Sequence, residues 1–329
     1  YDMPIYVLAW GVLLAGMLQL LIQISPLLSI NRLPVPKLDI KNQGLRKFFK
    51  LILPAILAGG IIQINLLIDT IFASLLETGS PTWLYVSDRL IQFPMGIFAI
   101  AIGTILLPTL SNIDLEREKN IFIENIKKGQ KFVLFIGIPS LIGLFFCAED
   151  LISTIFYRGE FTELDVFKSS YSLMAFSIGL PFFMLMKVLT PAFFARKDTK
   201  TPMYVAFISL VLNAFFNYLL AFVFGFGHVG LAIGSSIAAL ISVLILETIL
   251  YKQGFIKITN MFNRFNFMIL ISSSFLIVFL NFYTTKTNFI EFNQIERLFY
   301  LSIEILASIF IYFFIARIIN GKPLRTLLN

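Results

Sequence analysis

The sequence contains few of the residues on which soluble enzymes and secreted domains depend. Its 329 residues include one cysteine, Cys147, and one histidine, His228. A single cysteine permits no internal disulfide, and a lone histidine leaves no cluster for zinc or for a catalytic triad. We therefore predict that the protein is not an enzyme and has no resident cofactor.

Charged residues are also scarce. They make up 14% of the chain, against 58% for hydrophobic residues, and the mean hydropathy is +0.86. This composition excludes a water-soluble fold, because it exceeds the apolar surface that a soluble domain can bury. The net charge of +7 does not indicate nucleic acid as a partner, since the basic residues lie between apolar runs and not in one patch.

Long apolar runs predict an all-α fold, a polytopic transmembrane helix bundle of about nine spans. The predicted spans are residues 4–25, 48–76, 83–108, 131–148, 166–194, 202–223, 229–250, 265–284 and 297–316. Of the 26 Lys and Arg residues, 20 fall in one set of connections and 3 (Arg158, Lys286 and Arg297) in the other. The richer set is expected to be cytoplasmic, which places residue 1 on the periplasmic side and the C-terminus in the cytoplasm.

Two regions are expected to depart from simple spans. The run 48–76 is about 43 Å long as a helix, so it must tilt, protrude or bend, and Pro54, Gly59 and Gly60 mark the expected bend. The stretch 112–128 mixes many charged residues with Ile121, Phe122 and Ile126. This pattern predicts an amphipathic helix along the cytoplasmic interface.

The span 83–108 carries Asp88, Arg89 and Gln92. A guanidinium that faced lipid there would cost at least a few kcal/mol, so Arg89 is expected to face a wet cavity, with Gln92 on the same face and Asp88 on another. Pro94 is expected to open the helix locally. The alternative is a structural arginine that pairs with Asp88 or with a neighbouring helix.

Amide and carboxylate groups recur at helical spacing in two other spans. Asn65 and Asp69 are one turn apart, as are Asn213 and Asn217, and Ser235 or Ser236 of the next span is within plausible reach. Such oxygens within a membrane can bind Na⁺ or relay a proton. The alternative is hydrogen bonding that only joins the helices.

Other polar residues are interpreted conservatively. Lys187 is a candidate for substrate contact, but extension of its side chain to the cytoplasmic surface is the favoured interpretation. Glu247 and Glu304 are interpreted as boundary residues of their spans. The segment 225–230 matches G-x-G-x-x-G, but it follows no strand, so we predict an external turn and no dinucleotide site.

Four segments carry a family resemblance. They are DRLIQFPMGIFAIAIGTILLPTLS at 88–111, INLLIDTIFAS at 64–74, FYRGEFTELD at 156–165 and KVLTPAFFARKDTKTP at 187–202. In this order they resemble the MviN/MurJ family of lipid II flippases, of the multidrug/oligosaccharidyl-lipid/polysaccharide exporter superfamily. The resemblance extends from the first span to about Lys257.

The resemblance implies a two-lobed transporter that moves lipid II, the undecaprenyl-pyrophosphate-linked peptidoglycan precursor, to the outer leaflet of the bacterial inner membrane by alternating access. It implies that Arg89 and its neighbour Asp88 belong to the cavity that holds the pyrophosphate. Relatives are thought to bind Na⁺ at positions that match Asp69 and the Asn213/Asn217 pair. Here that pair has no carboxylate, which weakens the charge balance for a cation.

By the same resemblance, the chain is expected to be a C-terminal portion that lacks about five N-terminal spans. Residues 1–25 would be the last span of the N-terminal lobe, 26–47 a cytoplasmic connection and 48–260 the helices of the C-terminal lobe. Residues 261–329 would hold the final two helices, which line a groove for the lipid tail, and a cytoplasmic tail. Expected partners are lipid II and membrane lipids, with cell-wall synthesis proteins as further candidates.

Three rival functions remain open at this point. The first is a related exporter of another lipid-linked glycan or of a cationic drug, for which carboxylates would suit the cavity better than Arg89. The second is a membrane enzyme acting on lipid pyrophosphates, which would need paired acids, a base or metal ligands. The third is a scaffold that binds partner proteins without transport.

Overall fold

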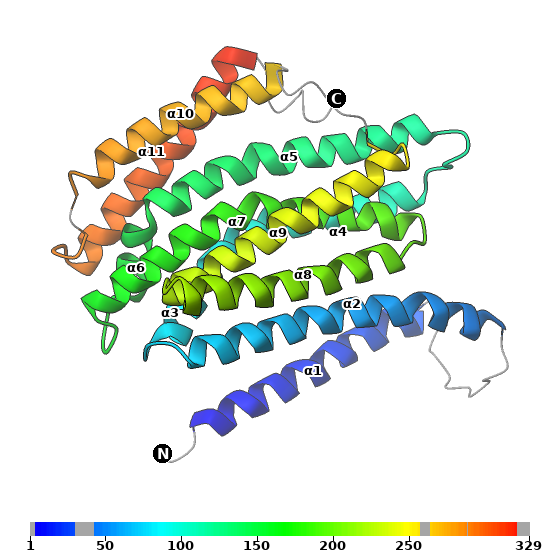
Figure 1. Cartoon of the computed structure of the whole chain (residues 1–329), viewed down its shortest axis with the longest axis horizontal. Coiled ribbons are helices and arrows are strands. Elements are labelled where there is room, and N and C mark those ends of the chain that lie inside the picture. Colours follow the sequence, from blue (N-terminus) through cyan, green and yellow to red (C-terminus); the bar gives the residue numbers. More distant parts are fainter. Residues whose placement is uncertain (1–3, 30–42, 257–263, 288, 321–329) are drawn as a thin grey trace. The chain divides into compact units, whose positions relative to one another are not determined.

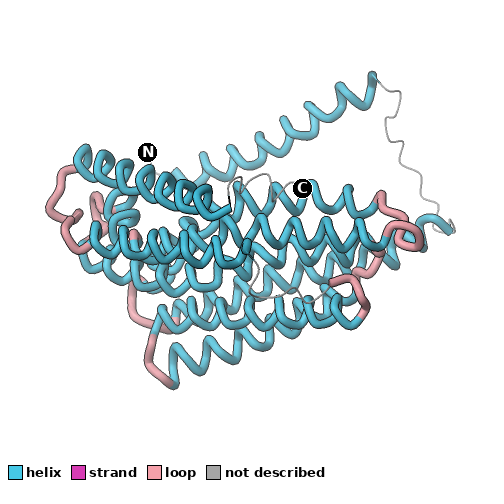
Figure 2. Tube along the Cα trace, turned by 90° about the horizontal axis from the view of Figure 1, so that it is seen from above, coloured by secondary structure: helices cyan, strands magenta, loops and turns pink. Residues whose placement is uncertain are grey.

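The computed structural model describes residues 4–29, 43–256, 264–287 and 289–320, and within these ranges the chain is helical and contains no strand (Figures 1 and 2). The chain divides into two units, Tyr1–Phe49 and Lys50–Asn329. The first unit contains α1 (Pro4–Ser29), which has exposed apolar side chains along its length. The all-α prediction is confirmed.

The remaining helices follow in chain order. They are α2 (Gln43–Ser74), α3 (Ser80–Pro94), the π-helix η1 (Met95–Ile100), α4 (Ala101–Ser111), α5 (Lys119–Phe146), α6 (Ala148–Phe156), α7 (Glu163–Ala195), α8 (Lys200–Tyr218), the π-helix η2 (Leu219–Val223), α9 (Gly227–Lys252), α10 (Arg264–Thr284) and α11 (Gln294–Asn320).

Eight helical stretches among the described residues are long and apolar enough to cross a membrane, and α2 adds a shorter apolar stretch, Gly59–Ser74. α2 is one continuous helix through Gly59 and Gly60, about 48 Å long at 1.5 Å per residue. The side chain of Pro54 and most of the predicted connection 26–47 lie outside the described residues, as does the predicted cytoplasmic tail after residue 320.

Helices α7 and α9 form the centre of the second unit. α7 packs against α3, α4, α5 and α9, and α9 also packs against α8. Their buried faces combine large residues such as Leu180 and Met184 with small ones such as Gly179 and Ser236. Small residues let membrane helices approach closely, which strengthens packing where lipid supplies no hydrophobic driving force.

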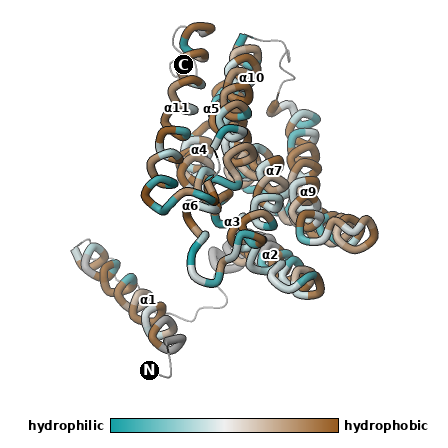
Figure 3. Tube along the Cα trace, turned by 90° about the vertical axis from the view of Figure 1, so that its left-hand side faces the viewer, coloured by the Kyte–Doolittle hydropathy of each residue, from teal (hydrophilic) through white to brown (hydrophobic). Residues whose placement is uncertain are grey.

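A second core joins α5 to the last two helices. Phe135, Met268 and Tyr312 are its large buried members, and the Tyr312 hydroxyl donates to the Phe135 carbonyl at 2.9 Å. Outward faces of α10 and α11 are strongly apolar (Figure 3). This pattern suits helices whose outer side chains meet lipid.

The predicted amphipathic helix over 112–128 is wrong. α4 ends at Ser111, and residues from Lys119 onward already belong to α5, which continues without a break to Phe146. Phe122 and Ile126, which were expected at the membrane surface, are fully buried in the core. The apolar stripe is therefore explained by packing against other helices.

Two connections hold more helix than the apolar runs indicate. The predicted connection at 149–163 contains the short helix α6, and Arg297, counted with an external connection, lies buried within α11. Near Pro94, where the helix was expected to open, it departs from α-helical geometry and continues as the π-helix η1. π-helical turns are frequent at functional sites. In the 225–230 segment, only Gly225 and Phe226 precede α9, and Gly227–Gly230 form its first turn; Gly225 and Gly227 have positive φ.

Candidate functional site

Asp69, Asn213 and Asn217 meet between α2, α8 and α9. The Asn217 amide donates to Asp69 Oδ1 at 2.6 Å and to Asn213 Oδ1 at 2.9 Å. Asn213 in turn donates to Ser235 Oγ at 3.0 Å, and Asn65 donates to Asp69 Oδ2 at 3.5 Å. We call these five residues the oxygen cluster. The structure therefore brings together five of the six residues predicted for a cation site.

Ser236, the sixth, lies elsewhere. Its hydroxyl contacts the carbonyls of Ala175 and Ala232, both at 3.0 Å, so it joins α9 to α7. Neighbouring positions on a helix project about 100° apart, which explains why Ser235 and Ser236 face different helices.

Close packing of α9 on α8 makes the oxygen cluster possible. A Cβ atom at Gly234 would lie 2.2 Å from Asn217 Oδ1, and one at Gly230 would lie 2.7 Å from the Ala221 nitrogen. Only glycine permits such an approach at these two positions. Asn217 is thereby held with its amide nitrogen toward α2.

The oxygen cluster fits a monovalent cation or a proton. Asp69 is its one carboxylate and so balances a single positive charge. Asn65 Oδ1 and Asn217 Oδ1 are buried and accept no hydrogen bond from the described residues. Buried acceptors without donors are costly, and a bound cation would compensate them. The other members contribute amide and hydroxyl oxygens, which are hard ligands suited to Na⁺.

Arg89 lies on an exposed face of α3, nine residues after Ser80 and so about 14 Å along the helix. Its guanidinium lies 4.6 Å from the ring centre of Tyr85 and donates to Gln92 Oε1 at 3.4 Å. Gln92 Nε2 donates to Asp88 Oδ2. None of the ion pairs among the described residues includes Arg89, so its pairing with Asp88, the structural alternative, is not seen.

The Arg89 group and the oxygen cluster are electrostatically connected. Asp69 and Asp88 carry like charges when both are ionised, and these charges repel each other. Asp88 also holds Gln92, which contacts Arg89. A short chain of polar contacts and charge interactions thus links the two predicted sites.

Lys187 does not belong to this group. Its carbonyl lies against Gly103 of α4, where an added Cβ would be 2.8 Å away. Gly103 is 14 residues beyond Arg89 along the same helical run, or about 21 Å. The Lys187 side chain is exposed and makes no hydrogen bond or ion pair with the described residues.

Glu247, interpreted from sequence as a boundary residue, is half-buried. It accepts a hydrogen bond from Gln130 Nε2 at 2.7 Å. The contact joins α9 to α5 near the end of α9, so Glu247 lies close to the end of its helix as expected and also links two helices.

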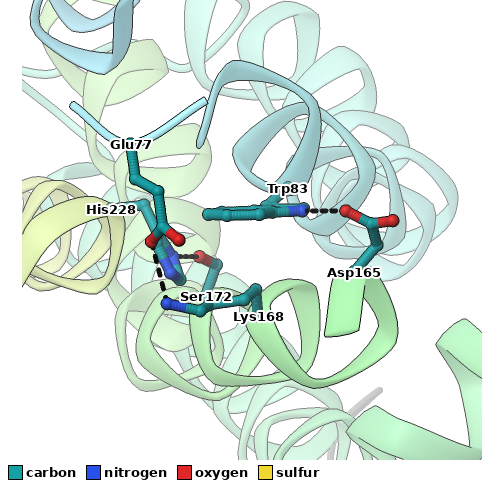
Figure 4. Close-up of polar contacts among 6 residues, drawn as sticks. All are labelled: Glu77, Trp83, Asp165, Lys168, Ser172 and His228. Carbon is teal, nitrogen blue, oxygen red and sulfur yellow. Dashed lines mark hydrogen bonds and ion pairs between the residues drawn. The ribbon is translucent and has the colours of Figure 1, made fainter. Parts of the chain in front are cut away.

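A polar network that the sequence patterns did not predict lies near the start of α3 (Figure 4). We call it the Trp83 network; its members are Glu77, Trp83, Asp165, Lys168, Ser172 and His228. Trp83 Nε1 donates to Asp165 Oδ1 at 2.7 Å, and Lys168 pairs with Glu77 at 2.9 Å. Asp165 also completes the capping box of α7 with Thr162. The Asp165 carboxylate therefore both caps the N-terminus of α7 and holds α3 against α7.

His228 anchors α9 in the same network. Its Nδ1 lies 2.6 Å from the Ser172 hydroxyl, and its ring meets the Trp83 ring edge-on at 4.9 Å. Gly79, at φ +104°, precedes α3 and leaves room for the Trp83 ring, because an added Cβ would lie 2.6 Å from it. The sequence does show an indole N–H at Trp83 and charged residues near the predicted span ends, and these could have indicated a polar contact. Which of them pair depends on which helices are neighbours, and the sequence alone does not show this.

Residues 1–300 match the family described as "Lipid II flippase MurJ". The chain is 42% identical over 259 residues to the probable lipid II flippase MurJ of Vibrio cholerae, covering 79% of this chain and 49% of that protein. It is 41% identical over 251 residues to the Haemophilus influenzae counterpart, covering 74% and 49%. The chain thus spans about half the length of these curated relatives.

Solved structures agree on the fold. A lipid II flippase MurJ in an inward closed conformation aligns with a TM-score of 0.70 at 27% identity, covering 91% of this chain and 59% of that one. A MOP superfamily transporter from Pyrococcus furiosus aligns with a TM-score of 0.53 at 19% identity, which supports the fold alone.

Proposed function

This chain belongs to the lipid II flippase MurJ family, and on that premise we propose that it forms part of a transporter that moves lipid II from the cytoplasmic to the outer leaflet by alternating access. The observation that carries the proposal is the Arg89 group. Its guanidinium is exposed, lies well within a membrane-spanning helical run and forms no ion pair among the described residues. Such a group suits a pyrophosphate, which it can bind through two parallel hydrogen bonds.

Gln92 gives Arg89 its orientation in this proposal. It accepts from the guanidinium and donates to Asp88, so Asp88 holds the arginine indirectly and leaves its charge available. A direct ion pair would compete with an anionic ligand. The Tyr85 ring supports the other side of the guanidinium.

The oxygen cluster would couple transport to Na⁺ or to protons. A positive charge taken up at Asp69 would reduce the repulsion that Asp69 exerts on Asp88. Asp88 would then hold Gln92 and Arg89 differently, so the ion and the headgroup would each favour one conformation. The oxygen cluster also joins α2 to α8 and α9, the contacts that a change between conformations would alter.

The protein is a multi-pass bacterial membrane protein. We assign it to the inner membrane, with residue 1 on the periplasmic side and the C-terminus in the cytoplasm, on the distribution of Lys and Arg. The unit Lys50–Asn329 would contain both the C-terminal lobe and the final two helices.

Cysteine labelling tests this topology. In a Cys147→Ser background, Arg158→Cys is expected to react with a membrane-impermeant thiol reagent in intact cells, and Lys119→Cys only after permeabilisation, because 158 lies in a periplasmic connection and 119 in a cytoplasmic one. Permeabilised cells, in which both sites should react, control for burial. Labelling of 119 but not 158 in intact cells would reverse the assigned orientation.

Rescue of growth tests the transport function. The complete gene product is expected to restore growth and lipid II translocation in bacteria depleted of their own flippase. Membrane levels are checked by immunoblot. A protein that reaches the membrane at normal levels but moves no lipid II would refute the proposal and favour an exporter of another substrate.

A further inference from the structure

Helix α6 lies antiparallel to the beginning of α11. The chain breaks helical geometry at Cys147 and then forms α6 (Ala148–Phe156). Gln294 Nε2 donates to the Thr154 carbonyl at 2.8 Å, and Arg297 Nη1 approaches the Ser153 carbonyl at 3.4 Å. The end of α6 therefore meets the start of α11, and the start of α6 meets a point further along α11.

Each helix of this contact carries a buried carboxyl group, and the two groups interact electrostatically. Asp150 of α6 is 5% exposed and Glu304 of α11 is 0% exposed. Both oxygens of Glu304 and Oδ2 of Asp150 are buried and receive no hydrogen bond from the described residues. The interpretation of Glu304 as a boundary residue is therefore wrong.

No cation in the described chain neutralises the pair. Arg297, the buried guanidinium on α11, directs its N–H groups at backbone carbonyls, including those of Phe289 at 2.7 Å and Ile290 at 2.8 Å. Neither carboxyl group takes part in an ion pair among the described residues. The contact between α6 and α11 must therefore be stable without a counter-charge.

Two ionised carboxylates cannot satisfy these conditions. Each would be only an acceptor of hydrogen bonds, and two like charges repel strongly where water is excluded. A buried acceptor without a donor costs about 1–3 kcal/mol, and more when it is charged. One proton removes a charge and supplies the missing donor.

We propose that Asp150 and Glu304 form a proton-binding site, in which one proton shared between the two carboxyl groups holds α11 against α6. A metal ion is a poor alternative, because two carboxyl groups provide too few oxygens for the six or more ligands that hard cations prefer. Among the described residues no group of three metal-binding side chains surrounds the site.

The surrounding groups do not replace the proton. Three ionisable groups interact electrostatically with the pair. They are Glu149 on α6, the Cys147 thiol and the Tyr283 hydroxyl on α10. Ionisation of any of the three would add only negative charge. As donors, the Cys147 thiol can offer Glu304 only a weak hydrogen bond, and the Tyr283 hydroxyl already donates to the Tyr300 carbonyl. Burial, and then repulsion by Glu304, raises the pKa of Asp150 above its ordinary value.

The sign of the pH dependence follows. The pKa of a buried carboxyl group is higher when α6 and α11 are in contact than when they are apart. Such a group stabilises the contact fully at a pH below its ordinary pKa, and this stabilisation is lost as the pH rises through the raised pKa. The α6–α11 contact is therefore expected to be strongest in acid and to weaken in alkali. In the described chain, α11 packs against α10, α6 and α5, so loss of the proton would loosen one of its three contacts.

Infrared difference spectroscopy of the complete protein in membranes tests the site and needs no transport assay. Spectra recorded from acidic to alkaline pH are expected to show the C=O stretching band of a protonated carboxylic acid that persists at neutral pH and disappears in alkali. Asp150→Asn is expected to remove this band. Glu304→Gln should lower the midpoint of its disappearance by at least about one pH unit, because the amide donates a hydrogen bond and carries no charge.

Glu247→Gln is the matched control. Glu247 is a half-buried carboxyl group with its own donor, Gln130, so its replacement should leave the band in place. Retention of the neutral-pH band in both Asp150→Asn and the double variant Asp150→Asn/Glu304→Gln would overturn the proposal. So would a band that responds to Na⁺ at constant pH, because the site would then bind a cation. If either Asp150→Asn or the double variant fails to reach the membrane, retention or loss of the band in the remaining variant decides whether the proposal holds.

Discussion

Arg89→Ala is expected to abolish rescue of flippase-depleted cells. The side chain is the one cation of α3; it lies on an exposed face and forms no ion pair among the described residues. Each charge-assisted hydrogen bond to a pyrophosphate contributes roughly 1.5–3 kcal/mol, so loss of a two-bond contact corresponds to at least a hundredfold weaker binding. Lipid II translocation and growth are the measurements.

Arg89→Lys separates charge from geometry. Lysine keeps the positive charge but offers a point ammonium in place of the planar guanidinium, so transport should still fall about tenfold or more. Arg158→Ala removes a cation from an exposed connection and is the matched control, with normal rescue expected. Normal rescue by a well-expressed Arg89→Ala protein would return Arg89 to a structural role.

Asp69→Asn is expected to remove the dependence of transport on Na⁺ or on the proton gradient while the protein still reaches the membrane. The substitution keeps the size of the side chain and a possible contact with Asn217, but it deletes the one carboxylate of the oxygen cluster. Transport in membrane vesicles, measured with each ion gradient imposed separately, identifies the coupling ion.

Gly234→Ala tests the same cluster without changing its charge. The new methyl group would overlap Asn217 Oδ1, forcing the amide away from Asp69, so coupling should be impaired as in Asp69→Asn. Gly143→Ala, at a helical glycine with open space around it, is the control and should behave as the unmodified protein. If the unmodified protein transports equally well with no gradient of either ion, the coupling role of the cluster is wrong.

Local sequence patterns predicted the features that depend on a single helix. Asn65 with Asp69 and Asn213 with Asn217 were each expected on one face because their spacing is one helical turn, and the structure places them so. Arg89 and Gln92 were paired by the same rule. Apolar length gave the helices, although their ends shifted where a stripe such as Phe122 and Ile126 packs inward.

By itself the sequence determined the membrane class, the all-α fold and the family, because apolar runs, composition and short motifs are properties of contiguous residues. Only the tertiary structure decided that Ser235 and not Ser236 joins the oxygen cluster, that Trp83 contacts Asp165, and that Glu304 interacts with Asp150. Trp83 and Asp165 are 82 positions apart in the sequence, and Asp150 and Glu304 are 154 positions apart. Ser235 and Ser236 are adjacent and differ only in the face of α9 on which they lie. Their meeting depends on which helices are neighbours and on small residues such as Gly234 that set how closely those helices pack, and no local pattern encodes either.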